Sequence, residues 1–183
     1  MDKRFQKQEQ VKQKIEEALF SLLKQKNFSE ITITELINEA GVARASYYRN
    51  FDSKEDIIES YMKRQRKEVA QKIAFTEEIT DLFIKEKLIT SLEHYLKQKY
   101  YILMLCDRGF DSLILEEMNQ FAEMMLGDMP SSSTDRYKLY FLAGALFNMT
   151  IHWLRSGAME SPRELATVFL NLMNNGIENT FLN

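Results

Sequence analysis

The segment from residue 32 to residue 56 restricts the fold most, because it places two helix-start signals on either side of a glycine. Thr32-Ile-Thr-Glu35 is a capping box: the Thr32 hydroxyl accepts a hydrogen bond from the amide of the third helical residue, and Glu35 reaches back. Ser53 is a second N-cap, and acidic residues follow it in the first turn. Gly41 ends the first of these two helices.

A second short helix is expected at about 43–50, almost directly after the glycine. A longer helix at about 7–25 precedes both, because Val11, Ile15 and Leu22 fall on one stripe at helical spacing. Two short helices joined by a turn containing glycine, and braced by a longer helix, form a helix-turn-helix pattern.

The remainder of the chain also predicts helices. Only six glycines and two prolines among 183 residues argue against many short strands. Apolar periodicity and caps predict further helices over 53–74, 84–95, 113–126, 135–156 and from 161 onward, with a short buried piece at 100–106 and a loop at 127–133. We therefore expect an all-α fold of about nine helices, in which an N-terminal three-helix module with the helix-turn-helix pattern precedes a C-terminal helical bundle.

Charge is distributed unevenly along the chain. The net charge of −3 alone argues against a DNA-binding protein. Residues 1–72, however, hold 15 Lys and Arg against 12 Asp and Glu, whereas the remainder holds 9 against 15. This asymmetry suggests a basic end that meets a partner. The expected boundaries are 1–53 for the DNA-binding domain, 54–75 for a connecting helix, and 76–183 for the ligand-binding and dimerisation domain.

The short helix after Gly41 has two different faces. Ala43, Tyr47 and Phe51 lie on one side, at helical spacing. The other side carries two arginines, a tyrosine and an alanine, at positions 44, 45, 48 and 49. Such a face suits the major groove, where arginine binds guanine in bidentate fashion and alanine contacts a thymine methyl. The alternative is an ordinary solvated helix face, and the caps and glycine turn around this helix favour DNA.

The stretch ITITELINEAGVARASYYRNFDSKEDIIESYM resembles the DNA-binding module of the TetR family of bacterial regulators. That family's pattern is a Thr-capped helix, Ala-Gly-Val, a short helix ending in Tyr-x-x-Phe, and a Ser-Lys-Glu segment that opens the fourth helix. The resemblance covers about residues 8–62 at the level of motifs, and the rest of the chain is similar in length and helix count. It implies a homodimer with an N-terminal DNA-reading part and a variable C-terminal ligand-binding part.

The resemblance also implies roles for single residues. Arg44, Ala45 and Arg49 match base-facing positions. Five further residues match family positions that lie near the DNA backbone: Thr34, Ser46, Tyr48, Asn50 and Lys54. Tyr47 matches a position that is usually buried and aliphatic, so we assign it to the core. The family usually has Ser or Thr where this chain has Ala43, so the short helix lacks a side-chain N-cap, at a cost of about 1 kcal/mol.

The C-terminal half should hold a pocket for a small apolar or aromatic ligand, and its methionines suit an adaptable wall. Candidate lining residues are Tyr95, Tyr101, Met104, Met118, Phe121, Met125, Phe147 and Trp153. Methionines and aromatic residues at helical spacing are also typical of an ordinary hydrophobic core. The last two helices offer more apolar surface than one small bundle buries, which predicts a two-fold dimer interface. Its candidate residues are Phe141, Ala145, Met149, Leu165, Val168, Phe169, Leu172 and Met173.

Other features exclude several classes of protein. His94 and His152 have no Cys or His companion at metal-ligand spacing, and no P-loop or GxGxxG occurs. We therefore expect no metal, no cofactor and no enzymatic activity. The N-terminus is too charged for a signal peptide and no apolar run is long enough to span a bilayer. Cys106 stands alone, which fits a reducing, intracellular setting, and the resemblance implies the bacterial cytoplasm; we expect no membrane partner.

These features together favour a ligand-responsive, dimeric transcriptional regulator, most simply a repressor that binds a palindromic double-stranded operator. One alternative is an activator of the same fold whose C-terminal domain binds a protein partner. A second alternative is a helical interaction protein that does not bind DNA, in which the arginine face would tolerate substitution. Ligand and operator sequence stay open.

Overall fold

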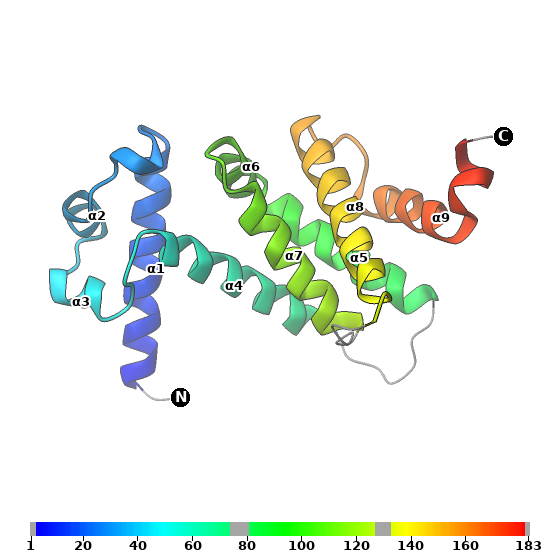
Figure 1. The fold of residues 1–183 in the computed structure, drawn as a ribbon. Helices are drawn as coiled ribbons and strands as arrows, with labels where there is room; N and C mark the ends of the chain where they lie inside the picture. The colour runs from blue at the N-terminus through cyan, green and yellow to red at the C-terminus, as the bar shows by residue number, and fades with distance from the viewer. Residues whose placement is uncertain (1–2, 74–80, 127–132, 182–183) are drawn as a thin grey trace. The chain divides into compact units, whose positions relative to one another are not determined.

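The computed structural model describes residues 3–73, 81–126 and 133–181. Over these ranges every regular element is helical, with nine α-helices, one short 3₁₀ helix and no strand (Figure 1). The expected all-α fold is confirmed. The chain divides into two compact units, Met1–Gln65 and Arg66–Asn183. Helix α4, Glu55–Lys72, contributes its first half to the first unit and its second half to the second.

The first unit contains α1 (Lys3–Leu23), the 3₁₀ helix η1 (Phe28–Glu30), α2 (Ile33–Ala40), α3 (Arg44–Tyr48) and the start of α4. The core of this unit is mainly apolar, and each of these elements except η1 contributes a buried side chain to it. The least exposed of them are Ile15, Leu19, Leu23, Ile31, Leu36, Tyr47, Ile57 and Ile58. Burial on this scale holds the short helices α2 and α3, which would be marginal in isolation.

Helix α2 is defined at both ends by local hydrogen bonds. The Glu35 amide donates to the Thr32 hydroxyl at 3.2 Å, and the Thr32 amide donates to the Glu35 carboxylate at 2.9 Å, which confirms the capping box. Gly41 closes α2 with φ +61°, a left-handed conformation that favours glycine. The Val42 amide then donates to the Ile37 carbonyl at 3.1 Å. Gly41 and this hydrogen bond therefore fix the path of the chain as it leaves α2.

The start of α4 is capped as the sequence predicted. The Asp56 amide donates to the Ser53 hydroxyl at 3.1 Å, and the Ser53 amide donates back to the Asp56 carboxylate at 3.0 Å. The same carboxylate accepts from the Asp52 amide at 2.9 Å. A side-chain hydrogen bond from Ser53 first, and then the Asp52 and Ser53 amides, stabilise the charged carboxylate and lower the pKa of Asp56.

The second unit contains α5 (Asp81–Lys97), α6 (Lys99–Asp107), α7 (Asp111–Leu126), α8 (Arg136–Arg155) and α9 (Pro162–Phe181), besides the end of α4. Helix α7 packs along α8, and α9 packs along α5 (Figure 1). The expected buried piece at 100–106 is helix α6. It buries Ile102, Leu105 and Cys106 but leaves Tyr100 54% exposed, because a helix of this length has an outward side. Most of the expected loop at 127–133 lies outside the described residues.

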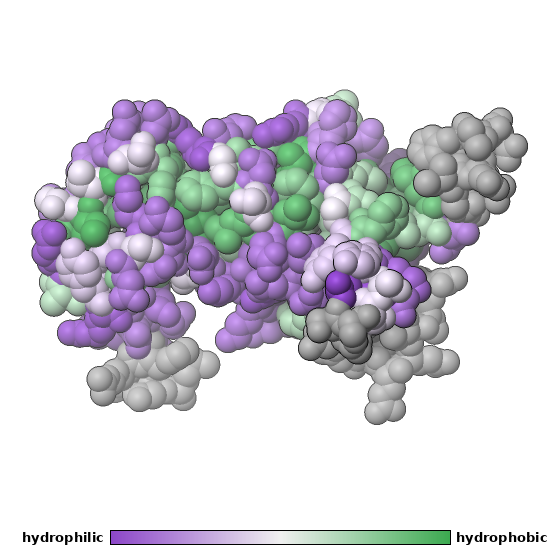
Figure 2. Space-filling view, viewed as in Figure 1, coloured by the Kyte–Doolittle hydropathy of each residue, from purple (hydrophilic) through white to green (hydrophobic). Residues whose placement is uncertain are grey.

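Helix α9 begins with a capping box. The Glu164 amide donates to the Ser161 hydroxyl at 3.2 Å, and the Ser161 amide donates to the Glu164 carboxylate at 2.8 Å. In the view of Figure 2, hydrophobic side chains gather over α7 and α8 of this unit. None of the helices in the described ranges has the length and apolar character needed to cross a membrane.

Candidate DNA-binding surface and ligand pocket

Helix α3 presents a polar, basic face to solvent. Arg44, Ala45 and Arg49 are exposed, and the Tyr48 side chain is 49% exposed. The Arg44 guanidinium lies 5.8 Å from the centre of the Tyr48 ring, which places a cation over the face of an aromatic side chain. The residues expected to face DNA bases therefore lie together on one solvent-accessible side of α3.

Tyr47 anchors the opposite side of α3. Its side chain is 0% exposed, and its ring lies edge-on to Tyr48 at 5.2 Å and tilted to Phe51 at 6.2 Å. Its hydroxyl has no hydrogen-bond partner among the described residues. Desolvation raises the pKa of Tyr47 to about 12. The assignment of Tyr47 to the core is confirmed, whereas Ala43, which the helical spacing placed on the same side, is exposed at the N-cap position and makes no side-chain cap.

The residues expected near the DNA backbone occupy different settings. Thr34 is exposed on α2. Ser46 and Asn50 are half-buried, and the Asn50 amide nitrogen donates to the Ser46 carbonyl at 2.7 Å, which closes the end of α3. Each lies at or beside α3, at positions compatible with a phosphate contact, which stays a prediction.

Lys54 is engaged within the first unit. Its ammonium donates to the Phe28 and Ile31 carbonyls at 2.8 and 2.7 Å and lies 4.6 Å from the centre of the Phe28 ring. An ammonium carries three donors, so two of them are used inside the protein. Lys54 therefore ties the start of α4 to η1, a role that the sequence pattern did not indicate.

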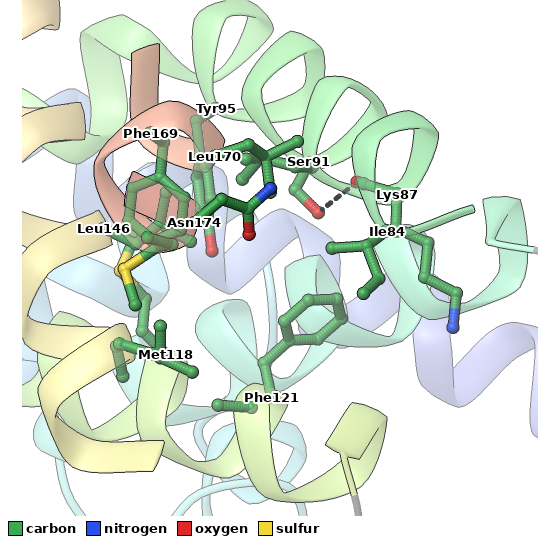
Figure 3. Close-up of a pocket in the computed structure, with 15 residues that line it drawn as sticks. Ile84, Lys87, Ser91, Tyr95, Met118, Phe121, Leu146, Phe169, Leu170 and Asn174 are labelled. Atoms are coloured by element: carbon green, nitrogen blue, oxygen red, sulfur yellow. Dashed lines mark hydrogen bonds between the residues drawn. The ribbon is translucent and has the colours of Figure 1, made fainter. Parts of the chain in front are cut away.

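The second unit contains an apolar cavity of about 430 Å³ between α5, α7, α8 and α9 (Figure 3). Three of the predicted ligand-binding residues line it: Tyr95, Met118 and Phe121. The sequence reasoning missed the other lining residues, which are Ile84, Lys87, Leu88, Ser91, Ala122, Leu142, Ala143, Leu146, Phe169, Leu170, Met173 and Asn174. Helical periodicity marked several of them as apolar but did not show that their faces meet.

Four predicted ligand-binding residues do not line this cavity. Tyr101 and Met104 belong to α6, which contributes no residue to the wall. Phe147 lies one position beyond Leu146, the last α8 residue of the wall. Trp153 is only 3% exposed, and its indole nitrogen donates to the Glu160 carbonyl at 3.0 Å, so it holds the end of α8. The side chain of Met125 lies outside the described part of the chain.

The predicted dimer residues fall into two groups. Phe141 and Val168 are 62% and 51% exposed, and Met173 is 36% exposed, so these side chains are accessible to a partner. Leu165 and Phe169 are buried within the unit itself, and Phe169 lines the cavity. Partial burial applies to the remaining candidates, which are Ala145, Met149 and Leu172.

A nearly buried ion pair connects α4 with the wall of the cavity. Arg66 Nη1 lies 3.1 Å from Glu117 Oε2, and the Glu117 side chain is 7% exposed. Arg66 also donates to the Gln120 side-chain oxygen. Glu117 and Gln120 directly precede the cavity residues Met118 and Phe121 on α7. The second half of α4 is therefore fixed to the helix that supplies one wall of the cavity.

His94 is buried beside this region, and its pKa is lowered because burial disfavours the imidazolium. Its Nε2 has no hydrogen-bond partner within the described ranges. Among those same residues, no three His, Cys, Asp or Glu side chains come together to hold a metal ion.

The exposed α3 face and the glycine turn before it form a helix-turn-helix, a motif found in DNA-binding transcriptional regulators. Residues 15–61 match the bacterial regulatory proteins of the tetR family, and residues 84–175 match a transcriptional regulator C-terminal region. The chain belongs to the TetR family, as the sequence resemblance predicted. No curated protein sequence matches it.

Solved structures share the fold. A TetR transcriptional regulator from Streptococcus agalactiae 2603V is 19% identical, with 92% of this chain and 96% of that chain covered and a TM-score of 0.67. The dihydroxyacetone kinase operon activator DhaS is 16% identical, with 89% and 93% covered and a TM-score of 0.58. Thermus thermophilus FadR, a repressor in complex with lauroyl-CoA, is 18% identical, with 91% and 94% covered and a TM-score of 0.51. At these identities the likeness concerns the fold alone.

Proposed function

We propose that this protein is a ligand-responsive repressor that binds a palindromic operator as a homodimer in the bacterial cytoplasm. The observation that carries the proposal is the α3 face, where Arg44, Ala45, Tyr48 and Arg49 are exposed on a helix held from behind by buried Tyr47. A short helix with this face enters the major groove, which is wide enough to admit it.

The two kinds of residue on α3 would have different tasks. Arg44 and Arg49 carry the donors that pair with guanine O6 and N7, so they would select sequence. Thr34, Ser46, Tyr48 and Asn50 carry hydroxyl or amide groups that donate to phosphate oxygens, so they would set the register of the helix. Lys54 would add at most its one remaining donor to a phosphate.

Dimerisation follows from the exposed apolar residues of α8 and α9, among them Phe141 and Val168. A two-fold dimer places two copies of α3 about 34–36 Å apart, one turn of B-DNA, and so requires a palindromic site. The interface would be isologous, with the same residues contributed by both protomers.

The cavity of the second unit supports control by a small molecule. Its volume of about 430 Å³ lies within the ~300–1,000 Å³ range of ligand sites, and its lining is mainly apolar. The ligand can shift the regulator only by binding one state more tightly than another. The Arg66–Glu117 ion pair gives such a ligand a route to α4, because it joins that helix to the cavity wall.

A second candidate function is that of an activator whose C-terminal domain binds a protein. The observation in its favour is the fold that the chain shares with the operon activator DhaS. The cavity supports the first candidate, since a unit that binds only a protein needs no apolar cavity of this size. Thermus thermophilus FadR is in complex with lauroyl-CoA, so in that protein this fold accommodates a ligand with an apolar acyl chain.

The first experiment is the selection of bound duplexes from a random-sequence DNA pool, near physiological salt. Wild type runs beside Arg44→Ala and a control, Arg163→Ala, which removes the same charge from an exposed site on α9. Because phosphate contacts dominate nonspecific binding, the control separates loss of base reading from loss of charge. We expect a palindrome from wild type and from the control, and a lost or relaxed palindrome from Arg44→Ala.

The outcomes separate the proposals. If Arg44→Ala selects the same palindrome as wild type, Arg44 does not contribute to the recognition of DNA bases. No enrichment by any of the three proteins would overturn the operator-binding proposal for the protein alone, and would favour the activator that needs a partner first.

A further inference from the structure

Tyr95 of α5 reaches into the apolar cavity with a polar group, and the side-chain amide of Asn174 from α9 lies near it in Figure 3. Figure 3 shows its ring running into the space enclosed by the lining residues, with the hydroxyl oxygen at the inner end of the side chain. No hydrogen bond to this hydroxyl is found in the described part of the chain. The neighbouring Ser91 hydroxyl differs, because it donates to the Lys87 carbonyl at 2.9 Å.

The Tyr95 hydroxyl is a hydrogen-bond donor. Its pKa is raised above the ordinary value, first because burial disfavours the phenolate and second because the negative charge of Glu117 is nearby. The group therefore keeps its proton at any physiological pH. The hydroxyl faces the cavity, so an apolar ligand that fills this space would leave the donor without a partner, whereas an acceptor atom on the ligand would satisfy it.

We propose that the cavity selects an uncharged, largely apolar molecule that carries one acceptor oxygen, such as a ketone or ester carbonyl, and that Tyr95 donates the hydrogen bond that recognises it. This inference rests on the proposed function, because it names the class of ligand that the regulator senses.

Two observations favour an uncharged acceptor over a carboxylate. Glu117, although it is paired with Arg66, adds negative charge to the surroundings of the Tyr95 hydroxyl, which disfavours an anionic group there. Lys87 lines the cavity, but Figure 3 shows its ammonium directed away from Tyr95. The cation therefore does not compensate a negative charge at the inner end of the cavity.

Selection should act on the oxygen more than on the carbon skeleton. The many apolar lining residues accept similar shapes, and one methylene more or less changes affinity modestly. A ligand without an acceptor instead leaves the Tyr95 hydroxyl buried and without a partner. Tyr95 is thus a specificity-determining residue rather than a general contributor to affinity.

The test uses defined probes and calorimetric dissociation constants. The probes are three phenyl-substituted butanones with the carbonyl at successive positions, butylbenzene as the matched hydrocarbon, and 4-phenylbutyrate as the matched anion. The proteins are wild type, Tyr95→Phe, which removes only the hydroxyl, and the control Tyr101→Phe, which makes the same change outside the cavity wall. Thermal unfolding of each variant confirms that it is folded.

We expect wild type to bind the best butanone at least about tenfold more tightly than butylbenzene or 4-phenylbutyrate, the effect of one buried hydrogen bond. Tyr95→Phe should lose that preference, with butylbenzene affinity unchanged, and Tyr101→Phe should keep it. Equal affinity for ketone and hydrocarbon in wild type, a preference that survives in Tyr95→Phe, or tighter binding of the anion would overturn the proposal.

Failure of this inference is distinguishable from failure of the proposed function. If no probe binds while the DNA selection yields an operator, the cavity does not take this class of ligand and the inference is wrong, although the protein remains a sequence-specific regulator. If the probes bind as expected and no operator is found, the proposed ligand class is supported and the repressor proposal is wrong.

Discussion

Tyr47→Phe should stabilise the protein, which is unusual for a change at a 0% exposed position. The substitution removes one hydroxyl that is buried and has no partner among the described residues, and it leaves the ring contacts with Tyr48 and Phe51 in place. Leaving a buried hydroxyl without a partner costs about 1–3 kcal/mol. Part of that gain is offset by the small void left behind, so we expect a net increase of about 1 kcal/mol.

The measurement is thermal unfolding, monitored by circular dichroism. An increase of about 1 kcal/mol corresponds to a rise in Tm of about 2–4 °C for a chain of this size. Tyr48→Phe is the matched control, because that side chain is 49% exposed and its hydroxyl costs nothing to hydrate. Operator affinity should be the same in Tyr47→Phe and wild type, since a fully buried side chain does not reach DNA.

The pH dependence gives an independent check. The pKa of Tyr47 is raised from 10.0 to about 12 in the folded protein, so wild type loses stability as the pH rises from 10 toward 12, where the hydroxyl ionises in the unfolded chain but not in the folded protein. Tyr47→Phe should lack this alkaline loss. A lower Tm in Tyr47→Phe than in wild type would refute the reasoning, because it would show that a buried water or another group supports the hydroxyl.

Three further predictions follow from the contacts described above. Thr32→Ala should lower the free energy of unfolding by about 1 kcal/mol, because it removes the cap of α2, and urea denaturation should show no such loss for exposed Thr34→Ala. Lys26 first, and then Thr32, lower the pKa of Glu35 from 4.5 to about 2, so its contribution to stability is present above pH 4.5 and is lost as the pH falls toward 2; Glu35→Gln should flatten this part of the stability profile. Glu117→Gln should keep operator affinity but weaken the release of DNA by the best phenyl ketone, and equal release in both proteins would contradict the proposed route to α4.

Helix starts were predictable because each depends on a few neighbouring residues. Thr32, Ser53 and Ser161 cap their helices through contacts within three or four positions of the chain, which the sequence displays directly. The exposed face of α3 was predictable for the same reason, since one buried side chain, Tyr47, orients the whole two-turn segment.

The cavity was only partly predictable, because its walls come from helices far apart in the sequence. An apolar stripe looks the same whether it meets another helix or an empty space. Trp153 and Phe147 therefore resembled ligand residues, although Trp153 is held by the Glu160 carbonyl. Leu142 and Leu170 lacked any distinguishing local signal and yet line the cavity, because the packing of α8 and α9 brings them to it.

Lys54 bears on how mutational data from such regulators are interpreted. Because its ammonium binds the Phe28 and Ile31 carbonyls, Lys54→Ala would remove the lysine donor from both and loosen the segment in front of α2, although the Ile31 amide would still donate to the Phe28 carbonyl. An alanine scan scored only by DNA binding would count that loss as a missing phosphate contact. A positively charged residue beside a recognition helix can thus be indispensable for binding while its charge is directed at the protein's own backbone.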